Sequence, residues 1–227
     1  SLTALLSAGL LASTSAMAVD NVQSGYAGAE TGDWGGQNGA VIGPPDNTCA
    51  AMGSVGKVNL VSGFGFNLPE LPSTVITGVT AFVKASEGTV QIVGVQLAAD
   101  ADVDPPTMLL GAERDFPVPG TGNNCANTTV ASINGGLAGW GLAPGDLTPA
   151  IVNDSGFGIV FTKRETSNVK VDSICLEVDY TTPDGPAVQQ DCFAPPAQGN
   201  TVTVTKVVIG AAPGTDWAYT GTLGAFS

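Results

Sequence analysis

Hydrophobic and polar residues alternate along most of the chain, which is the pattern of β-strands with one buried face. The clearest example is the segment NVKVDSICLEVDYTT at residues 168–182. Because successive side chains of a strand point to opposite faces, one set should face a core and the other should face outward. The set predicted to face the core is Ile174, Leu176, Val178 and Tyr180. The set predicted to face outward is Ser173, Cys175, Glu177 and Asp179.

Other segments have the same β-strand character and are separated by turn signals such as Leu-Pro, Pro-Pro, Pro-Gly and Glu-Gly. They are residues 56–69, 74–85, 88–98, 107–116, 127–133 and 156–164. Residues 145–154 favour one short helical turn with Asp146 as its N-cap. About seven or eight strands within roughly 160 residues predict an all-β fold, an antiparallel β-sandwich of the jelly-roll kind, over residues 19–182.

The two ends of the chain differ from this central pattern. Residues 1–18 combine an apolar run with the A-x-A motif Ala16-Met17-Ala18, so we expect a secretory signal peptide that starts upstream and is cleaved before Val19. Residues 183–200 are rich in Pro, Gly, Gln and Asp, which predicts a linker. Residues 201–227 contain two strand-like segments joined by a turn, which predicts the first hairpin of a truncated second β module.

Composition narrows the classes of function. The chain carries 7 basic and 20 acidic residues, and this excess of negative charge argues against binding to nucleic acid, whose phosphates require Lys and Arg. No run of about 18 apolar residues is present, so no membrane span is predicted. Histidine is absent, which removes His-based nucleophile systems and His-liganded metals. We therefore expect a secreted, extracellular protein that is not an enzyme.

Four cysteines behind a signal peptide predict two disulfides, for which three connectivities exist. Cys49 and Cys125 lie in similar polar loops next to strands, and we predict that they pair. Cys175 lies on the outward face of the last strand and Cys192 follows in the linker, so we predict that these two pair. The second disulfide would hold the linker against the sandwich and fix where the next module begins.

Several stretches of the chain resemble known proteins. DWGGQNGAVIGPPDN and GFGFNLPELPSTVITGVTAFVKA, with WGLAPGDLTPAIVNDSGFGIVF and VKVDSICLEVDYT further along, resemble small β-sandwich domains of bacterial exported and phage-associated proteins across residues 33–182. TVTVTKVV and DWAYTGTLGAF, within residues 201–227, are similar to the first strands of prealbumin-like or pilin-type repeat modules of bacterial surface proteins. Together these resemblances imply an extracellular structural or adhesive protein without a catalytic motif.

The second resemblance implies one specific reaction. In pilin-type modules, a lysine on the first strand forms an isopeptide bond with an asparagine, assisted by a nearby carboxylate. Lys206 lies on the strand that would carry this lysine, and its partners would lie beyond Ser227. The alternative interpretation is an edge-strand lysine that discourages pairing with other chains.

An acidic loop is the candidate metal site. Asp100, Asp102 and Asp104 occupy alternate positions between two predicted strands, and carboxylate oxygens are the ligands that calcium prefers. Pro105 and Pro106 stand where an EF-hand loop needs its glycine turn, so the hypothesis is a looser surface calcium site. A solvated acidic loop without metal is the alternative.

Sugar-binding and sugar-cleaving sites are also conceivable from residue types. Trp34, Trp140 and Trp217 could form a sugar-binding platform, although tryptophans of a sandwich more often pack in its core. Asn127 and Asn153 begin N-glycosylation sequons, which matter only in a host that glycosylates. Candidates by type for a pair of glycosidase carboxylates, without a motif to support them, are Asp33, Glu70, Asp115, Asp154, Glu165 and Glu177.

The sequence therefore predicts a secreted or cell-surface structural or adhesive β-sandwich module. Its partners would be extracellular proteins or glycans and further modules of its own chain. A carbohydrate-binding accessory module of a secreted enzyme is the first alternative, and a hydrolase that uses carboxylates is another. A further alternative is a filament subunit in which residues 19–26 complete the sheet of a neighbouring subunit.

Overall fold

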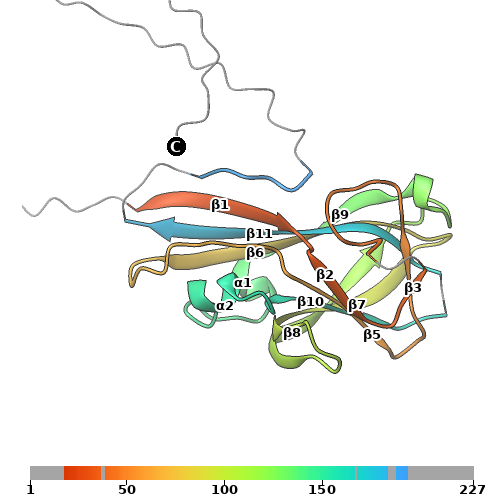
Figure 1. Cartoon of the computed structure of the whole chain (residues 1–227), viewed down its shortest axis with the longest axis horizontal. Helices are drawn as coiled ribbons and strands as arrows, with labels where there is room; N and C mark the ends of the chain where they lie inside the picture. The colour runs from red at the N-terminus through yellow and green to blue at the C-terminus, as the bar shows by residue number, and fades with distance from the viewer. Residues whose placement is uncertain (1–17, 37–38, 167, 184–187, 194–227) are drawn as a thin grey trace, which may run out of the picture. The chain divides into compact units, whose positions relative to one another are not determined.

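The structure is a computed structural model that describes residues 18–36, 39–166, 168–183 and 188–193. These residues form two antiparallel β-sheets around a shared hydrophobic core, so the predicted all-β sandwich is confirmed (Figure 1). Nearly all of the predicted signal peptide lies outside the described residues, as do Lys206, Trp217 and the whole of residues 201–227. Among the described residues, no helix is both long enough and apolar enough to cross a bilayer.

The first sheet is built around the last strand. Its strands are β1 (Val19–Tyr26), β3 (Trp34–Gly36), β4 (Ala50–Met52), β6 (Val75–Ser86), β9 (Thr129–Ile133) and β11 (Lys170–Thr182). The order is β3-β4-β11-β6-β9. Along the edge that does not pair with β6, β11 pairs with two strands. β4 pairs with the first two residues of β11, and β1 pairs along its second half. The β1–β11 ladder runs from Val19 opposite Thr182 to Tyr26 opposite Cys175.

The second sheet has the order β2-β5-β10-β7-β8. Its strands are β2 (Ala29–Gly32), β5 (Val58–Ser62), β7 (Gln91–Asp100), β8 (Thr107–Val118) and β10 (Gly158–Lys163). Three short helices, η1 (Cys125–Asn127), α1 (Gly136–Gly139) and α2 (Pro149–Asn153), lie in the connections. The predicted helical turn is α2, but the prediction of Asp146 as its cap is wrong. Thr148 is the N-cap, because its hydroxyl accepts from the amide of Ile151.

The core lies between the two sheets and follows the period-two pattern. The predicted core-facing residues of β11 are all buried there, together with inward residues of β6, β7 and β10. Trp140 is completely buried, and its indole N–H donates to the carbonyl of Val79 over 2.8 Å. Full burial of one large apolar side chain contributes roughly 1.5–3 kcal/mol, so this shared core is the main source of stability.

Two segments differ from their predictions, one in where its strand ends and the other in which strand it pairs with. The expected strand at residues 56–69 ends at Ser62, where Gly63 and Gly65 adopt positive φ angles of 69° and 70° that few other residues tolerate. Residues 19–26 form β1, which pairs with β11 of the same chain. The filament hypothesis assigned this strand to a neighbour's sheet, but here it completes its own sheet.

Candidate functional site

Two chain segments cover the outer face of the first sheet, and a disulfide ties each of them down. The first cover is the 43–49 loop, which precedes β4. The second cover is residues 188–193, which we call the clasp. The structure forms the Cys49–Cys125 and Cys175–Cys192 disulfides, the pairing that the sequence predicted. The described part of the expected linker is therefore attached to the sandwich.

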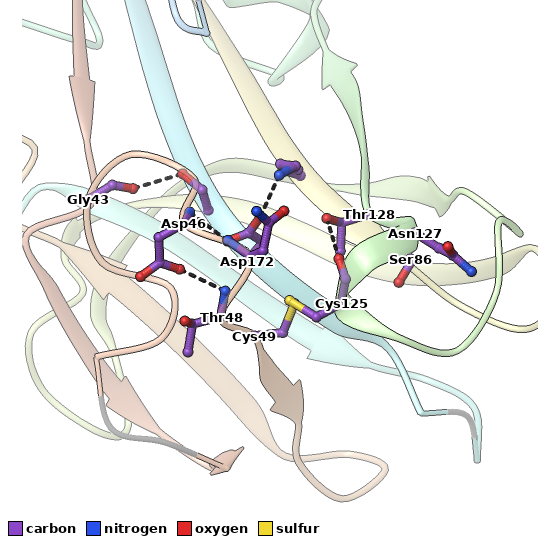
Figure 2. A network of polar contacts seen from close by, with 12 residues as sticks. Gly43, Asp46, Thr48, Cys49, Ser86, Cys125, Asn127, Thr128 and Asp172 are labelled. Atoms are coloured by element: carbon purple, nitrogen blue, oxygen red, sulfur yellow. Dashed lines mark hydrogen bonds and ion pairs between the residues drawn. A yellow bond between two sulfur atoms is a disulfide. The ribbon is translucent and has the colours of Figure 1, made fainter.

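Asp172 is the centre of the polar network beneath the 43–49 loop (Figure 2). Its carboxylate Oδ2 lies 2.6 Å from the Nζ atom of Lys84 on β6, and its side chain is completely buried. The Lys84 side chain is 18% exposed, so the ammonium group retains some contact with water. The other oxygen, Oδ1, accepts from the backbone amides of Asp46 and Asn47 over 3.3 and 3.2 Å.

A β-bulge in β11 explains why Asp172 reaches this position. The register of β11 against β6 shifts between Val171 and Ser173, so Asp172 is the additional residue. A bulge places two residues opposite one and re-aims a side chain. Ser173, opposite Lys84, donates its hydroxyl to the carbonyl of Gly43 over 2.8 Å. The adjacent residues Asp172 and Ser173 of β11 thus bind the 43–49 loop at two places.

The helix η1 supplies the other anchor of the same region. The hydroxyl of Ser86 at the end of β6 donates to the carbonyl of Asn124 over 3.0 Å, and the side chain of Asn124 accepts from the amide of Asn127. Thr128 closes the turn by donating its hydroxyl to the carbonyl of Cys125 over 2.9 Å. Figure 2 shows the disulfide joining this turn to the 43–49 loop. The covalent bond therefore connects two segments that are each fixed to the sheet by hydrogen bonds.

The clasp lies along the free edge of β1 and then crosses onto β11. The amide of Val22 donates to the carbonyl of Val188, and the amide of Gln190 donates back to the carbonyl of Val22, a short parallel pairing. The amide of Val188 donates to the side chain of Asn21 over 2.8 Å. In Figure 1 the clasp is the blue segment that follows β11.

The end of the clasp packs on one cross-strand row of the first sheet. Tyr26, Cys175 and Phe82 are neighbours in this row on β1, β11 and β6. The ring of Phe193 packs edge-on against Tyr26 at 5.5 Å and against Phe82 at 6.5 Å, and its amide donates to the Tyr26 hydroxyl. Cys175 points outward as predicted, yet it is completely buried because the clasp covers it.

Two acidic residues of β11, Glu177 and Asp179, have raised pKa values. Glu177 accepts a hydrogen bond from the amide of Cys192. Burial raises the pKa of Glu177, an effect that this hydrogen bond opposes and that the nearby charges of Asp191 and Asp179 increase. Burial also raises the pKa of Asp179. Ionisation of these carboxyls therefore costs stability in the folded state.

The predicted calcium ligands lie at the end of β7 and in the loop before β8. In the part of the chain that the structure describes, no group of three or more Asp, Glu, Cys or His side chains is arranged to hold a metal, so the calcium site stays a prediction. Asp100 accepts from the Thr107 hydroxyl over 2.6 Å. A hydrogen bond between the side chains of Asp100 and Asp102 lowers the pKa of Asp100 and raises that of Asp102.

The predicted sugar-binding residues are largely engaged inside the molecule. Trp140 is buried, and Trp34 is half-buried with its indole N–H donating to the carbonyl of Leu60. Neither of these two tryptophans offers an exposed ring for a platform. The side chain of Asn153 both donates to and accepts from the backbone of Leu68, whereas Asn127 is exposed. Of the two sequons, Asn127 is the accessible one.

The candidate carboxylates are dispersed over the surface. Asp115 and Glu113 both pair with Arg164, Asp154 accepts from a backbone amide, and Glu177 binds the clasp. Asp33 lines a polar cleft of about 340 Å³ together with Asp104. The other residues that line this cleft are Gly32, Gly56, Lys57 and Val58.

Sequence reasoning missed Lys84 and Asp172, the charged pair of this site. The available signal was local, because Asp172 and Ser173 are two consecutive polar residues in an otherwise alternating strand. Such a doubled polar position is typical of a bulge. The roles of Tyr26 and Phe193 had no comparable signal, since their contact joins residues far apart in the chain.

No known protein family and no curated protein matches this chain. Among solved structures, the coat protein of Tobacco streak virus in a C2 crystal form is similar with a TM-score of 0.32 and 11% identity, over 79% of this chain and 94% of that one. The dimer of the same coat protein gives a TM-score of 0.30 and 13% identity, over 79% and 92%. Likeness at this level defines no family, and the resemblances to bacterial surface modules stay predictions.

Proposed function

We propose that the chain is a secreted, cell-surface structural or adhesive module that performs no catalytic turnover. The observation that carries this proposal is the pair of stapled covers on one sheet, the 43–49 loop and the clasp, each held by its own disulfide. Structural disulfides persist in oxidising compartments outside the cytosol. A module whose disulfides hold its surface segments in place is suited to a location outside the cell.

The use of the buried charges supports a structural role. The Asp172 carboxylate is occupied by Lys84 and by two backbone amides. The ammonium group of Lys163, on a residue only 8% exposed, donates to the carbonyls of Met52 and Gly53. Charged groups that are buried and hydrogen-bonded inside the fold in this way hold segments of the chain together, which is a structural use. Extracellular proteins or glycans would then bind through surface shape and charge.

Surface labelling of the native cell tests this proposal. Intact cells that produce the full-length protein are treated with an impermeant biotin reagent, and the thiols are counted with a maleimide before and after reduction. We expect labelling on intact cells, no reactive thiol before reduction, and weaker attachment to host or matrix surfaces when the gene is deleted. A cytosolic protein with four free thiols would refute the proposal.

A further inference from the structure

The chain leaves the sandwich at the end of the β1–β11 ladder that lies opposite the end where β11 finishes. β11 ends at Thr182, which pairs with Val19, the first residue of β1. The clasp then runs parallel to β1 and returns the chain to the opposite end of the ladder, where Cys192 is bonded to Cys175. Cys175 pairs with Tyr26, the last residue of β1.

This return changes where tension would enter the fold. A pull on the chain beyond Phe193 reaches β11 through the disulfide at Cys175, because a covalent bond does not yield before hydrogen bonds do. Tension applied at Val19, the N-terminal residue that the predicted signal-peptide cleavage would leave, enters β1 at its first residue. The two points lie at opposite ends of a ladder that spans about 24 Å, at about 3.4 Å for each residue step.

The direction of the load decides how the ladder breaks. Hydrogen bonds of an antiparallel pair are perpendicular to the strands. A load along the strands stresses all of these bonds together, which is shear. Without the disulfide, the load would enter at Thr182, directly opposite Val19, once the noncovalent contacts of the clasp had broken, and it would then open the pairs one after another from that end.

We infer that the sandwich is a load-bearing module in which the Cys175–Cys192 disulfide converts unzipping of the β1–β11 ladder into shear. This inference rests on the proposed cell-surface function, since it concerns a chain held at a surface and pulled. If a ligand grips the sandwich itself, tension from the following segment still enters at Cys175, a residue of β11 that pairs with strands on both sides. The end of the strand is protected in either case.

The noncovalent contacts of the clasp fit the same role. They hold Phe193 between Tyr26 and Phe82, on the row that contains Cys175. The chain therefore exits next to the covalent attachment and not at a distance from it. Loss of the disulfide would leave only these weak contacts to carry the load.

Force spectroscopy on single molecules tests the inference. The full chain is held by a handle at each terminus, and the native protein is compared with the variant Cys175→Ser/Cys192→Ser. We expect the first rupture force to fall in the variant. The total released length should increase by about 60 Å, because 17 residues leave the closed loop at about 3.5 Å each.

The variant Cys49→Ser/Cys125→Ser is the matched control, because its disulfide lies outside the load path. It should lengthen the released chain by about 270 Å, for 76 residues, while the first rupture force stays at the native value. Equal first rupture forces in the two variants would overturn the inference.

If circular dichroism shows that either variant is unfolded, the native protein is measured before and after addition of a reductant, with the same expected fall in force. An unchanged force after reduction, with the added length confirming cleavage, would also overturn the inference. Neither result bears on surface labelling, so failure of the shear geometry and failure of the proposed location are distinguishable.

Discussion

Replacing Asp172 by alanine is expected to lower the free energy of unfolding by about 3 kcal/mol or more. Removal of one partner of a buried ion pair costs roughly 3–5 kcal/mol, because the other charge is left uncompensated. The lower end applies here, since the Lys84 side chain is 18% exposed and can turn toward water. The amides of Asp46 and Asn47 also lose their acceptor.

The variant Asp172→Asn separates these two effects. Its side-chain oxygen can still accept from the two loop amides, while the negative charge is absent. The difference between the alanine and asparagine variants therefore measures the attachment of the 43–49 loop. At 3.2 and 3.3 Å these hydrogen bonds are long, so we expect a difference of about 1 kcal/mol.

A double-mutant cycle with Lys84→Met isolates the ion pair. The methionine variant should also be destabilised, because it leaves the Asp172 carboxylate, which is completely buried, without its cation. The double variant Lys84→Met/Asp172→Asn should lose less than the sum of the two single losses, with a coupling of about 1–3 kcal/mol. Urea denaturation with both disulfides intact, followed by the fluorescence of the buried Trp140, provides the measurement. Losses that add to within about 0.5 kcal/mol would refute a coupled pair.

Three further predictions concern the disulfides, the glycines and the pH dependence. Replacing both cysteines of the Cys49–Cys125 disulfide, which spans 76 residues, by serine should lower the free energy of unfolding by about 4.5 kcal/mol. The same replacement of the Cys175–Cys192 disulfide, which spans 17 residues, should lower it by about 3 kcal/mol. The reverse order of these losses in urea denaturation would contradict the chain-entropy account. Gly25→Ala should cost about 1–3 kcal/mol, because its methyl group would overlap the backbone carbonyl of Phe64. Gly94→Ala should cost under about 1 kcal/mol, because its methyl group meets only side chains, those of Glu113 and Arg164, which can move at the surface. Equal shifts in the urea midpoint would count against this contrast. Glu177→Gln should stabilise the protein at pH 7 and change its stability little at pH 4, because burial raises the pKa of Glu177. The charge of Glu177 therefore destabilises the folded state above that raised pKa and is absent below the ordinary value of about 4.3. An equal effect at both pH values in urea denaturation would exclude this cause.

The long strands were predictable from sequence, and the covering segments were not. Period-two alternation placed β6, β7, β8 and β11 to within a few residues, and it identified the inward set of β11 correctly. The same pattern could not show that Cys175 and Ser173 are buried, because their outer face is covered by segments distant in the chain. The short strands β2, β3 and β4 lie in a glycine-rich region with little alternation, which explains why they were missed.

Disulfide pairing was accessible to sequence reasoning, but the polar site was not. The pairs followed from two similar loops and from the closeness of Cys192 to the last strand. The Lys84–Asp172 pair depends on a bulge that shifts one side chain by one position. The two consecutive polar residues Asp172 and Ser173 indicate a bulge, but which residue lies opposite it depends on the pairing between strands, so Lys84 could not be identified from one strand.

The double pairing of β1 has a consequence for the order in which the protein can fold during its synthesis. β1 is the first strand to appear, yet one of its edges waits for β11 and the other for the clasp, some 167 residues later between Asn21 and Val188. Contacts of such long range form late, because the intervening loop must be closed first. The leading end of the domain therefore stays unpaired until nearly all of it has been synthesised, a condition that is compatible with the secretion that we propose.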